Sequence, residues 1–186
     1  MCRDAARLKA KAGGLADVSA LLVDSLHNDG RDVHLAMPHY RHLFEEDRSC
    51  ANHPNDRLNL GKAVHLAEDC HFYRLGGVYQ ADRIELRTFA LAFQREVINN
   101  IIPLVRPDIV HCNDWMTGLI PAVARRNGTP CLITIHNIHT EKVTMAQIEN
   151  RGIDAAEFWN HLYFENPPYS YEQSREGNVT DLLASG

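Results

Sequence analysis

One stretch of this chain constrains the fold more than any other. Residues 108–112 (Asp-Ile-Val-His-Cys) have the composition of a buried strand, and an apolar helix is predicted from Thr117 to Asn127, where Gly128 ends it. Residues 131–136 (Cys-Leu-Ile-Thr-Ile-His) then form a second buried strand. Two buried strands joined through a helix by short turns form a βαβ unit, whose strands run parallel and are covered on both faces. The sequence therefore predicts an α/β fold with a doubly wound, mostly parallel, Rossmann-like sheet and helices on both faces.

The rest of the chain fits this class. Residues 16–29 carry apolar side chains at helical spacing and are followed by a short strand at residues 32–37, which Pro38 closes. Strands are predicted at residues 58–68 and 71–75, and a long helix at 83–102, with Pro103 and Pro107 on either side of its end. Residues 41–57 and Pro167-Pro168 indicate irregular chain. Residues 146–151 and 178–184 are predicted to be helical.

Composition narrows the function classes. The 186 residues suffice for one domain, or for part of a larger protein, but not for two ordinary domains. A net charge of -5 disfavours a dedicated nucleic-acid binder and gives no reason to expect an anionic membrane as partner. No apolar run approaches the roughly 20 residues of a spanning helix, and the N-terminus lacks the apolar segment of a secretory signal. We therefore expect a cytoplasmic protein.

Cysteines and histidines do not predict a metal site. The five cysteines are odd in number, scattered, and never in a C-x-x-C pair, so reduced thiols are expected. The eleven histidines include two local groups, but neither is accompanied by the cysteine or carboxylate framework of a structural zinc site. Loop or surface histidines are the simpler interpretation, and no metal or other cofactor is predicted.

Ligands of doubly wound sheets bind beyond the carboxyl ends of the strands, which selects three turns. In the first, residues 11–17 open a helix with Lys11, Gly13 and Gly14, a combination that can cradle a phosphate, although a Gly-Gly pair is more often a plain turn. It matches neither the dinucleotide nor the P-loop fingerprint. In the second, Asp114 and Trp115 follow a strand, either as a helix cap with a packed indole or as a polar and aromatic wall for a sugar.

The third turn contains His136 and Asn137, directly after the last buried strand. A histidine at such a place is most often a structural residue with satisfied hydrogen bonds. In combination the three turns are more informative than each is alone, because K-A-G-G-L-A-D-V (11–18), P-D-I-V-H-C-N-D-W-M-T-G (107–118) and T-I-H-N-I (134–138) occur in this order.

From Lys11 onward the sequence resembles the N-terminal, starch synthase catalytic domain of bacterial glycogen synthases and plant starch synthases. Residues 32–40 (D-V-H-L-A-M-P-H-Y), 76–80 (G-G-V-Y-Q) and the tail from Phe158 to Gly186 also resemble family segments. The resemblance implies a retaining glycosyltransferase of the two-domain GT-B type, which moves glucose from ADP-glucose to the non-reducing end of an α-1,4-glucan. The expected partners are thus a nucleotide sugar, an α-glucan and a C-terminal GT-B domain, with no cofactor besides the donor substrate.

The resemblance also implies roles for individual residues. Asp114 and His136 would line the glucose pocket as catalytic residues. Lys11 would contact the donor diphosphate beside the close-approach loop of Gly13 and Gly14, while further sugar or acceptor contacts are expected from these residues: Tyr79, Trp115 and Asn137. No side chain presents itself as a covalent nucleophile, and the family reaction is described as front-face transfer assisted by the leaving diphosphate.

Two departures from the family limit the expected activity. Residues 1–10 carry four charged side chains where relatives have an apolar first strand, so this segment is interpreted as atypical and the domain as residues 11–186. Relatives also hold most of the nucleotide in a C-terminal domain, which is not found here. We expect an inactive part of a synthase. A non-catalytic glucan-binding or assembly module, or a transferase with another nucleotide-sugar donor such as UDP-glucose, stays open.

Overall fold

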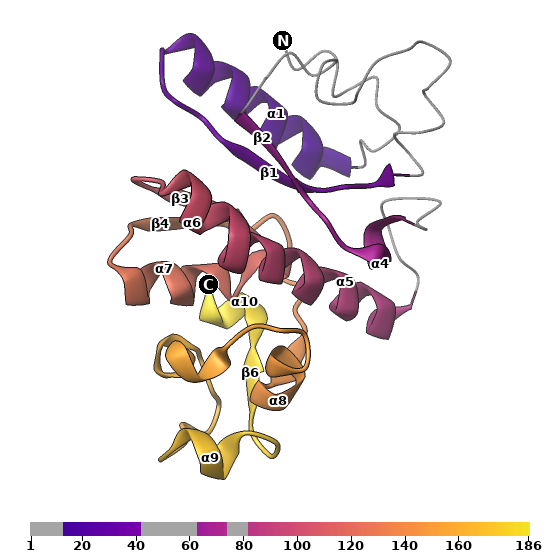
Figure 1. Cartoon of the computed structure of the whole chain (residues 1–186), viewed down its shortest axis with the longest axis vertical. Coiled ribbons are helices and arrows are strands. Elements are labelled where there is room, and N and C mark those ends of the chain that lie inside the picture. Colours follow the sequence, from indigo (N-terminus) through magenta and orange to yellow (C-terminus); the bar gives the residue numbers. More distant parts are fainter. Residues whose placement is uncertain (1–12, 42–62, 74–81) are drawn as a thin grey trace. The chain divides into compact units, whose positions relative to one another are not determined.

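A computed structural model of the chain describes residues 13–41, 63–73 and 82–186. The chain divides into two compact units, Met1–Phe89 and Ala90–Gly186, and the long helix α5 (Arg83–Glu96) crosses the boundary between them. Each unit combines helices with a pair of parallel strands (Figure 1). The predicted α/β class is confirmed.

The first unit contains helix α1 (Gly13–Asn28) and two parallel strands, β1 (Leu35–Pro38) and β2 (Val64–Ala67). The predicted helix begins three residues earlier than expected and ends as expected at Gly30, whose φ of 75° suits a residue without a side chain. The predicted apolar face of α1 is largely exposed, however: 51% of Val18 and 70% of Leu21 are accessible to solvent. The apolar core of this unit lies elsewhere, in an aromatic cluster where Phe89 stacks on Tyr40 and meets Phe72 edge-on.

The prediction of a strand at residues 71–75 is wrong, because the structure has helix α4 (Cys70–Tyr73) in the part of this range that it describes. Asp69 begins this helical turn: its carboxylate accepts the backbone N–H of His71 at 2.8 Å, and its carbonyl accepts that of Phe72 at 3.0 Å. Such local bonds favour a turn over an extended strand. Alternating polarity alone could not reveal this, because four residues do not distinguish a strand from one helical turn.

The long helix ends between Pro103 and Pro107, as the sequence predicts, but it extends three residues beyond the predicted last residue, Ile102. After α5, residues Val97–Ile101 form a π-helical turn, η2, and helix α6 (Ile102–Val105) follows. In the π turn the N–H of Ile102 bonds to the carbonyl of Val97, five residues back. The wider turn is the kind of local adjustment that lets a helix carry proline, which clashes with the carbonyl four residues before it in a regular α-helix. The helix ends at Arg106, which has a left-handed conformation (φ 52°).

The predicted βαβ unit is confirmed in the second unit of the chain. Strand β3 (Val110–Asn113) pairs in parallel with β4 (Cys131–Thr134), and helix α7 (Ile120–Asn127) connects them and packs against both. Gly128 ends α7 with a φ of 70°, as the sequence predicts. The first five residues of α7, Ile120 to Ala124, are all buried, so this helix contributes a large part of the apolar core of the unit.

The helix predicted at residues 178–184 is only half right. Its first part is strand β6 (Val179–Asp181), which pairs antiparallel with β5 (Lys142–Thr144), and only then does helix α10 (Leu182–Ser185) begin. The Asp181 carboxylate caps α10 by accepting the N–H of Ala184 at 3.0 Å. The helix predicted at 146–151 is confirmed as α8 (Met145–Glu149), and a further short helix, α9 (Tyr171–Ser174), follows the irregular chain at Pro167-Pro168.

Candidate functional site

The carboxyl ends of β3 and β4 bring two of the three predicted turns together. Asn113 lies opposite Thr134 in the strand register, and the N–H of Asp114 donates to the carbonyl of Thr134 at 3.0 Å. Asp114 and His136, 22 residues apart in sequence, therefore lie one and two residues beyond a shared sheet edge. The structure therefore brings Asp114 and His136 together at one edge of the strand pair.

The side chain of Asp114 fixes the turn that follows β4. The carboxylate, buried to 6% exposure, accepts the backbone N–H of His136 at 2.6 Å and that of Asn137 at 3.3 Å. Its second oxygen receives the Asn137 side-chain amide at 3.4 Å. Hydrogen bonds to an ionised acceptor are about twice as strong as neutral ones, so these contacts fix the backbone of the T-I-H-N turn.

The alternative in which Asp114 simply caps the following helix is wrong. No side-chain capping bond is present at the turn Trp115–Thr117 (η3), for which Asp114 is the preceding residue. Asp114 instead has a φ of 55° and a ψ of -178°, a combination that costs any residue with a side chain on the order of 1–3 kcal/mol. Strain of this kind persists only where surrounding contacts enforce it, and it concentrates at functional sites.

Thr117 and Gln94 supply those enforcing contacts. The Thr117 hydroxyl donates to the carbonyl of Asn113 at 2.9 Å and accepts the N–H of the same residue at 3.0 Å, which closes the turn on itself. The fully buried Gln94 of α5 accepts the N–H of Leu119 at 2.7 Å. Neither residue was singled out from the sequence, although Thr117 lies inside the motif at residues 107–118. Gln94 lies 25 positions before its partner Leu119, and no local pattern indicates its role.

His136 presents its ring to solvent beside the Asp114 turn. Its Nε2 lies 3.0 Å from the side-chain oxygen of Asn113, and because an amide oxygen accepts, Nε2 carries the proton. Nδ1 is then the ring nitrogen that can accept a hydrogen bond from a ligand hydroxyl. Asn113 thereby orients His136, a role the sequence did not predict.

Trp115 lies beneath the turn rather than in it. Its side chain is 3% exposed, and the ring of His139 meets it edge-on at a centroid distance of 5.7 Å. His139 Nε2 lies 3.6 Å from the buried carboxylate of Glu141. The backbone N–H of His139 donates to the side-chain oxygen of Asn137 at 2.9 Å. The indole therefore supports the turn by packing, and its buried ring does not present a stacking face for a sugar.

The first predicted turn is described only in part. Gly13 and Gly14 form the start of α1, with no atom within 4 Å of the position where a Cβ would stand on Gly14, so the backbone there is open to a ligand. Lys11 and Tyr79 lie outside the described residues. Asp69, Cys70 and His71 each bring one potential metal-ligand atom to within 4.8 Å of the others. The sequence did not predict this group of three.

A separate groove of about 330 Å³ lies between η2, α7 and the short helical turn Ala155–Glu157 (η4). Ile98, Val123 and Phe158 contribute apolar surface to it, while Asn99, Asn127 and Asp154 contribute polar groups. It contains none of the predicted site residues. Among the described residues, no helix has the length and apolarity needed to cross a membrane.

Comparison with known proteins supplies the context of this site. A family model described as the starch synthase catalytic domain matches residues 2–174. Glycogen synthases from Geotalea uraniireducens and Aromatoleum aromaticum are each 31% identical to the chain, over 80% and 83% of its length. The glycogen synthase of Syntrophotalea carbinolica is 29% identical over 79% of the chain. The aligned region is 36% to 38% of these relatives, so the chain spans less than two fifths of their length.

Proposed function

The chain belongs to the starch synthase catalytic domain family, and from this membership we propose that it forms the glucose-binding part of a glycogen synthase. The proposed reaction transfers glucose from ADP-glucose to the non-reducing end of an α-1,4-glucan with retention of configuration. The observation that carries the proposal is the Asp114 carboxylate, which orders the His136–Asn137 turn at the edge of a parallel strand pair. The proposal includes a cytoplasmic location.

In this mechanism Asp114 is the residue that shapes the site. Its two oxygens are engaged by three N–H donors from His136 and Asn137, so it acts by holding the turn and by placing a negative charge beneath the site. An oxocarbenium-like sugar carries partial positive charge, which a fixed negative charge stabilises without any reorganisation during the reaction.

His136 is the residue that contacts the sugar. Its exposed ring accepts a glucose hydroxyl at Nδ1, while Asn113 holds Nε2 at 3.0 Å and so fixes the ring. A hydroxyl held in one orientation contributes positioning, which accelerates a transfer between two bound substrates. The backbone amides at Gly13 and Gly14, together with Lys11, bind the diphosphate in this proposal, and Tyr79 and Asn137 provide further sugar or acceptor contacts.

Binding of the donor to the 186-residue chain tests the site. We expect ADP-glucose, observed by amide NMR, to perturb the resonances of His136 and Asn137, and ADP alone to leave them unchanged. Replacement of His136 by Ala should weaken this binding, whereas His161→Ala, at a half-buried histidine in the turn Trp159–His161 away from the strand edge, serves as the control. If UDP-glucose perturbs the His136 and Asn137 resonances equally, other residues select the nucleotide of the donor. An absence of any perturbation at millimolar ADP-glucose would contradict the proposed site.

Turnover and glucan binding separate the proposal from its alternatives. The active site of a two-domain GT-B transferase lies between its domains. We therefore expect this chain alone, incubated with ADP-glucose and glycogen, to release ADP at no more than the background rate. Robust turnover would contradict that expectation. Affinity electrophoresis in glycogen distinguishes a glucan-binding module, which would be retarded even where ADP-glucose leaves the His136 resonance unchanged.

A further inference from the structure

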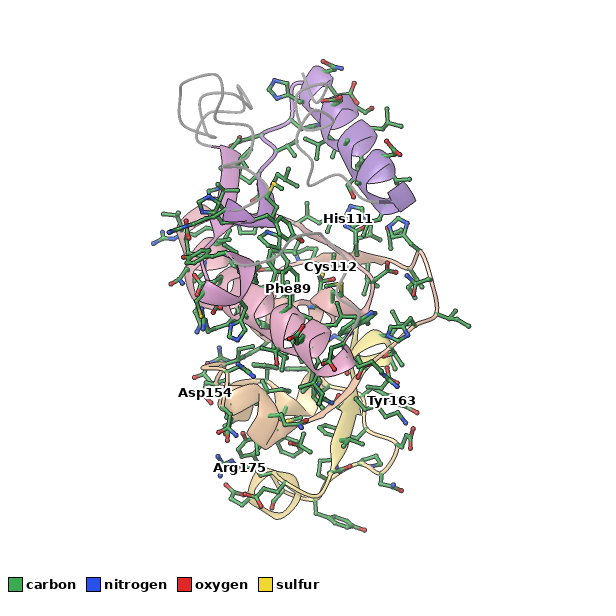
Figure 2. The ribbon with its side chains drawn as sticks, turned by 90° about the vertical axis from the view of Figure 1, so that its right-hand side faces the viewer. Phe89, His111, Cys112, Asp154, Tyr163 and Arg175 are labelled. Carbon is green, nitrogen blue, oxygen red and sulfur yellow. The ribbon has the colours of Figure 1, made fainter. Side chains whose placement is uncertain are left out.

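Two cysteines meet on the paired strands β3 and β4 and take no part in the proposed transfer. The Sγ atoms of Cys112 and Cys131 are 3.9 Å apart. Cys112 is 2% exposed, whereas Cys131 is half-buried at the start of β4 and accessible to small solutes (Cys112 is labelled in Figure 2). Both thiols are reduced.

The strand register argues against a disulfide between them. Cys131 lies opposite Val110, so Cys112 is two positions further along the neighbouring strand and on the same face. With strands about 4.8 Å apart and a rise of about 3.3 Å per residue, the two Cα atoms are separated diagonally by about 8 Å. Disulfides require Cα atoms no more than about 7 Å apart, so a bond would force one strand to slide. The strand ladder and the packing of α7 oppose that movement.

The same spacing suits two thiolates on one metal ion. At a zinc–sulfur distance of about 2.3 Å, two ligands of a tetrahedral ion stand about 3.8 Å apart. The observed 3.9 Å therefore needs almost no rearrangement. Thiolates are soft ligands that select ions such as Zn²⁺ and Cd²⁺ over Mg²⁺ or Ca²⁺.

The surroundings also favour a thiolate at Cys131. The hydrogen bond shared with Cys112 holds the pKa of the Cys131 thiol below its ordinary value, and the charge of Arg125 acts in the same direction, while partial burial opposes both. The same hydrogen bond and burial raise the pKa of the Cys112 thiol, so a metal ion has to displace the Cys112 proton. Solvent can reach the remaining coordination positions through the half-buried side of Cys131.

We propose that Cys112 and Cys131 form a bidentate site for a soft thiophilic cation of the Zn²⁺ or Cd²⁺ class. Binding replaces two S–H bonds by two S–metal bonds and releases both protons to solvent, and no electrons are transferred. The site lies two residues before Asp114 on β3 and five before His136 on β4. It is independent of the proposed glucosyl transfer, so it stands or fails separately from that function.

Titration with Cd²⁺ tests this site in the full chain. The starting protein carries Ser in place of Cys2, Cys50 and Cys70, so that only the strand pair remains, and thiolate-to-cadmium absorption in the ultraviolet reports binding. We expect one Cd²⁺ per chain, and in the same background Cys131→Ser should abolish the absorption and lower the affinity at least tenfold. Circular dichroism confirms that each variant is folded. Unchanged Cd²⁺ binding after Cys131→Ser would overturn the proposal.

The second cluster of metal-ligand type provides the competing outcome. The ligand atoms of Asp69, Cys70 and His71 lie within 4.8 Å of one another. If Cd²⁺ absorption in the unmodified chain disappears with Cys70→Ser and persists with Cys131→Ser, the metal binds at this group and the proposal is wrong.

An oxidation experiment tests the geometric argument itself. In the same three-serine background, the thiol oxidant diamide should form little intramolecular disulfide under native conditions and much more in urea, because only the unfolded chain can bring the two Cα atoms together. Disulfide formation as fast in the native chain as in urea would show that the strands move freely, and would refute the inference that the spacing selects a metal ion.

Discussion

Substitutions at Asp114 separate the strain of its backbone from the bonds of its side chain. Both Asp114→Ala and Asp114→Gly remove the carboxylate that accepts the backbone N–H of His136, a loss of about 1.5–3 kcal/mol for a charge-assisted bond. Of the two replacements, only glycine adopts the φ of 55° at position 114 without strain. The comparison of the two variants therefore cancels the loss of the side-chain bonds and leaves only the backbone contributions.

The magnitude follows from two opposing contributions. Relief of the strained conformation contributes about 1–3 kcal/mol in favour of glycine. The greater freedom of glycine in the unfolded chain opposes this by about 0.4–1 kcal/mol. We expect Asp114→Gly to be more stable than Asp114→Ala by about 1 kcal/mol, and with a urea dependence of about 2 kcal/mol per molar its unfolding midpoint should be higher by about 0.5 M.

Urea unfolding followed by tryptophan fluorescence measures this difference. Both tryptophans, Trp115 and Trp159, lie in the unit formed by residues 90–186, so the signal reports on the unit that contains Asp114. Asp154 is the matched control, because it is exposed and has an ordinary φ of -74°. There glycine should be less stable than alanine. If the Asp114 pair shows the same order as the Asp154 pair, the backbone at Asp114 is not strained and the reasoning is refuted.

Three further substitutions test other contacts. In Gly118→Ala the new Cβ would stand 1.8 Å from the carbonyl oxygen of Leu182, so thermal unfolding should reveal a loss of about 1–3 kcal/mol, whereas Gly177→Ala, which meets nothing within 4 Å, should be nearly neutral. Thr144→Ala removes the capping box of α8 and should cost about 1 kcal/mol in urea unfolding; an unchanged midpoint would mean that the cap is not formed in solution. For Glu68, burial alone would raise the pKa, but hydrogen bonds from neighbouring side chains hold it below the ordinary 4.5. Its stabilisation is thus present above that value and lost as the pH falls through the lowered pKa, so the urea midpoints of wild type and Glu68→Gln should differ at neutral pH and converge once the pH falls below the lowered pKa, and a constant difference would contradict this.

The predictability of the fold differs between its parts for identifiable reasons. The βαβ unit at residues 108–136 was predicted because each of its elements has a local signature: buried apolar strands, an apolar helix, and Gly128 at the helix end. The strand β6 was missed because its three residues extend only by pairing with β5, some 36 residues earlier in the chain. The extension of the long helix beyond Ile102 was missed because a π turn is invisible in residue type.

The candidate site shows the same division. Family motifs brought Asp114, His136 and Asn137 to attention, and the strand rule placed them at one edge. The support of that edge by Gln94 was not predictable, because a glutamine in an otherwise apolar helix face reveals its function only when a backbone N–H without another partner lies opposite it. The interpretation of Asp114 as a helix cap was wrong for a related reason: its partners are 22 and 23 residues away.

The sequence by itself determined the fold class, the family and the order of the three turns, since these depend on periodicity and motifs that are local along the chain. Only the tertiary structure decided what the carboxylate of Asp114 binds, that Trp115 is buried support, and that Cys112 and Cys131 lie 3.9 Å apart. Those facts depend on the register between β3 and β4. Register is set by the packing of distant segments against one another, and no local pattern in either strand records which residue of the other it will face.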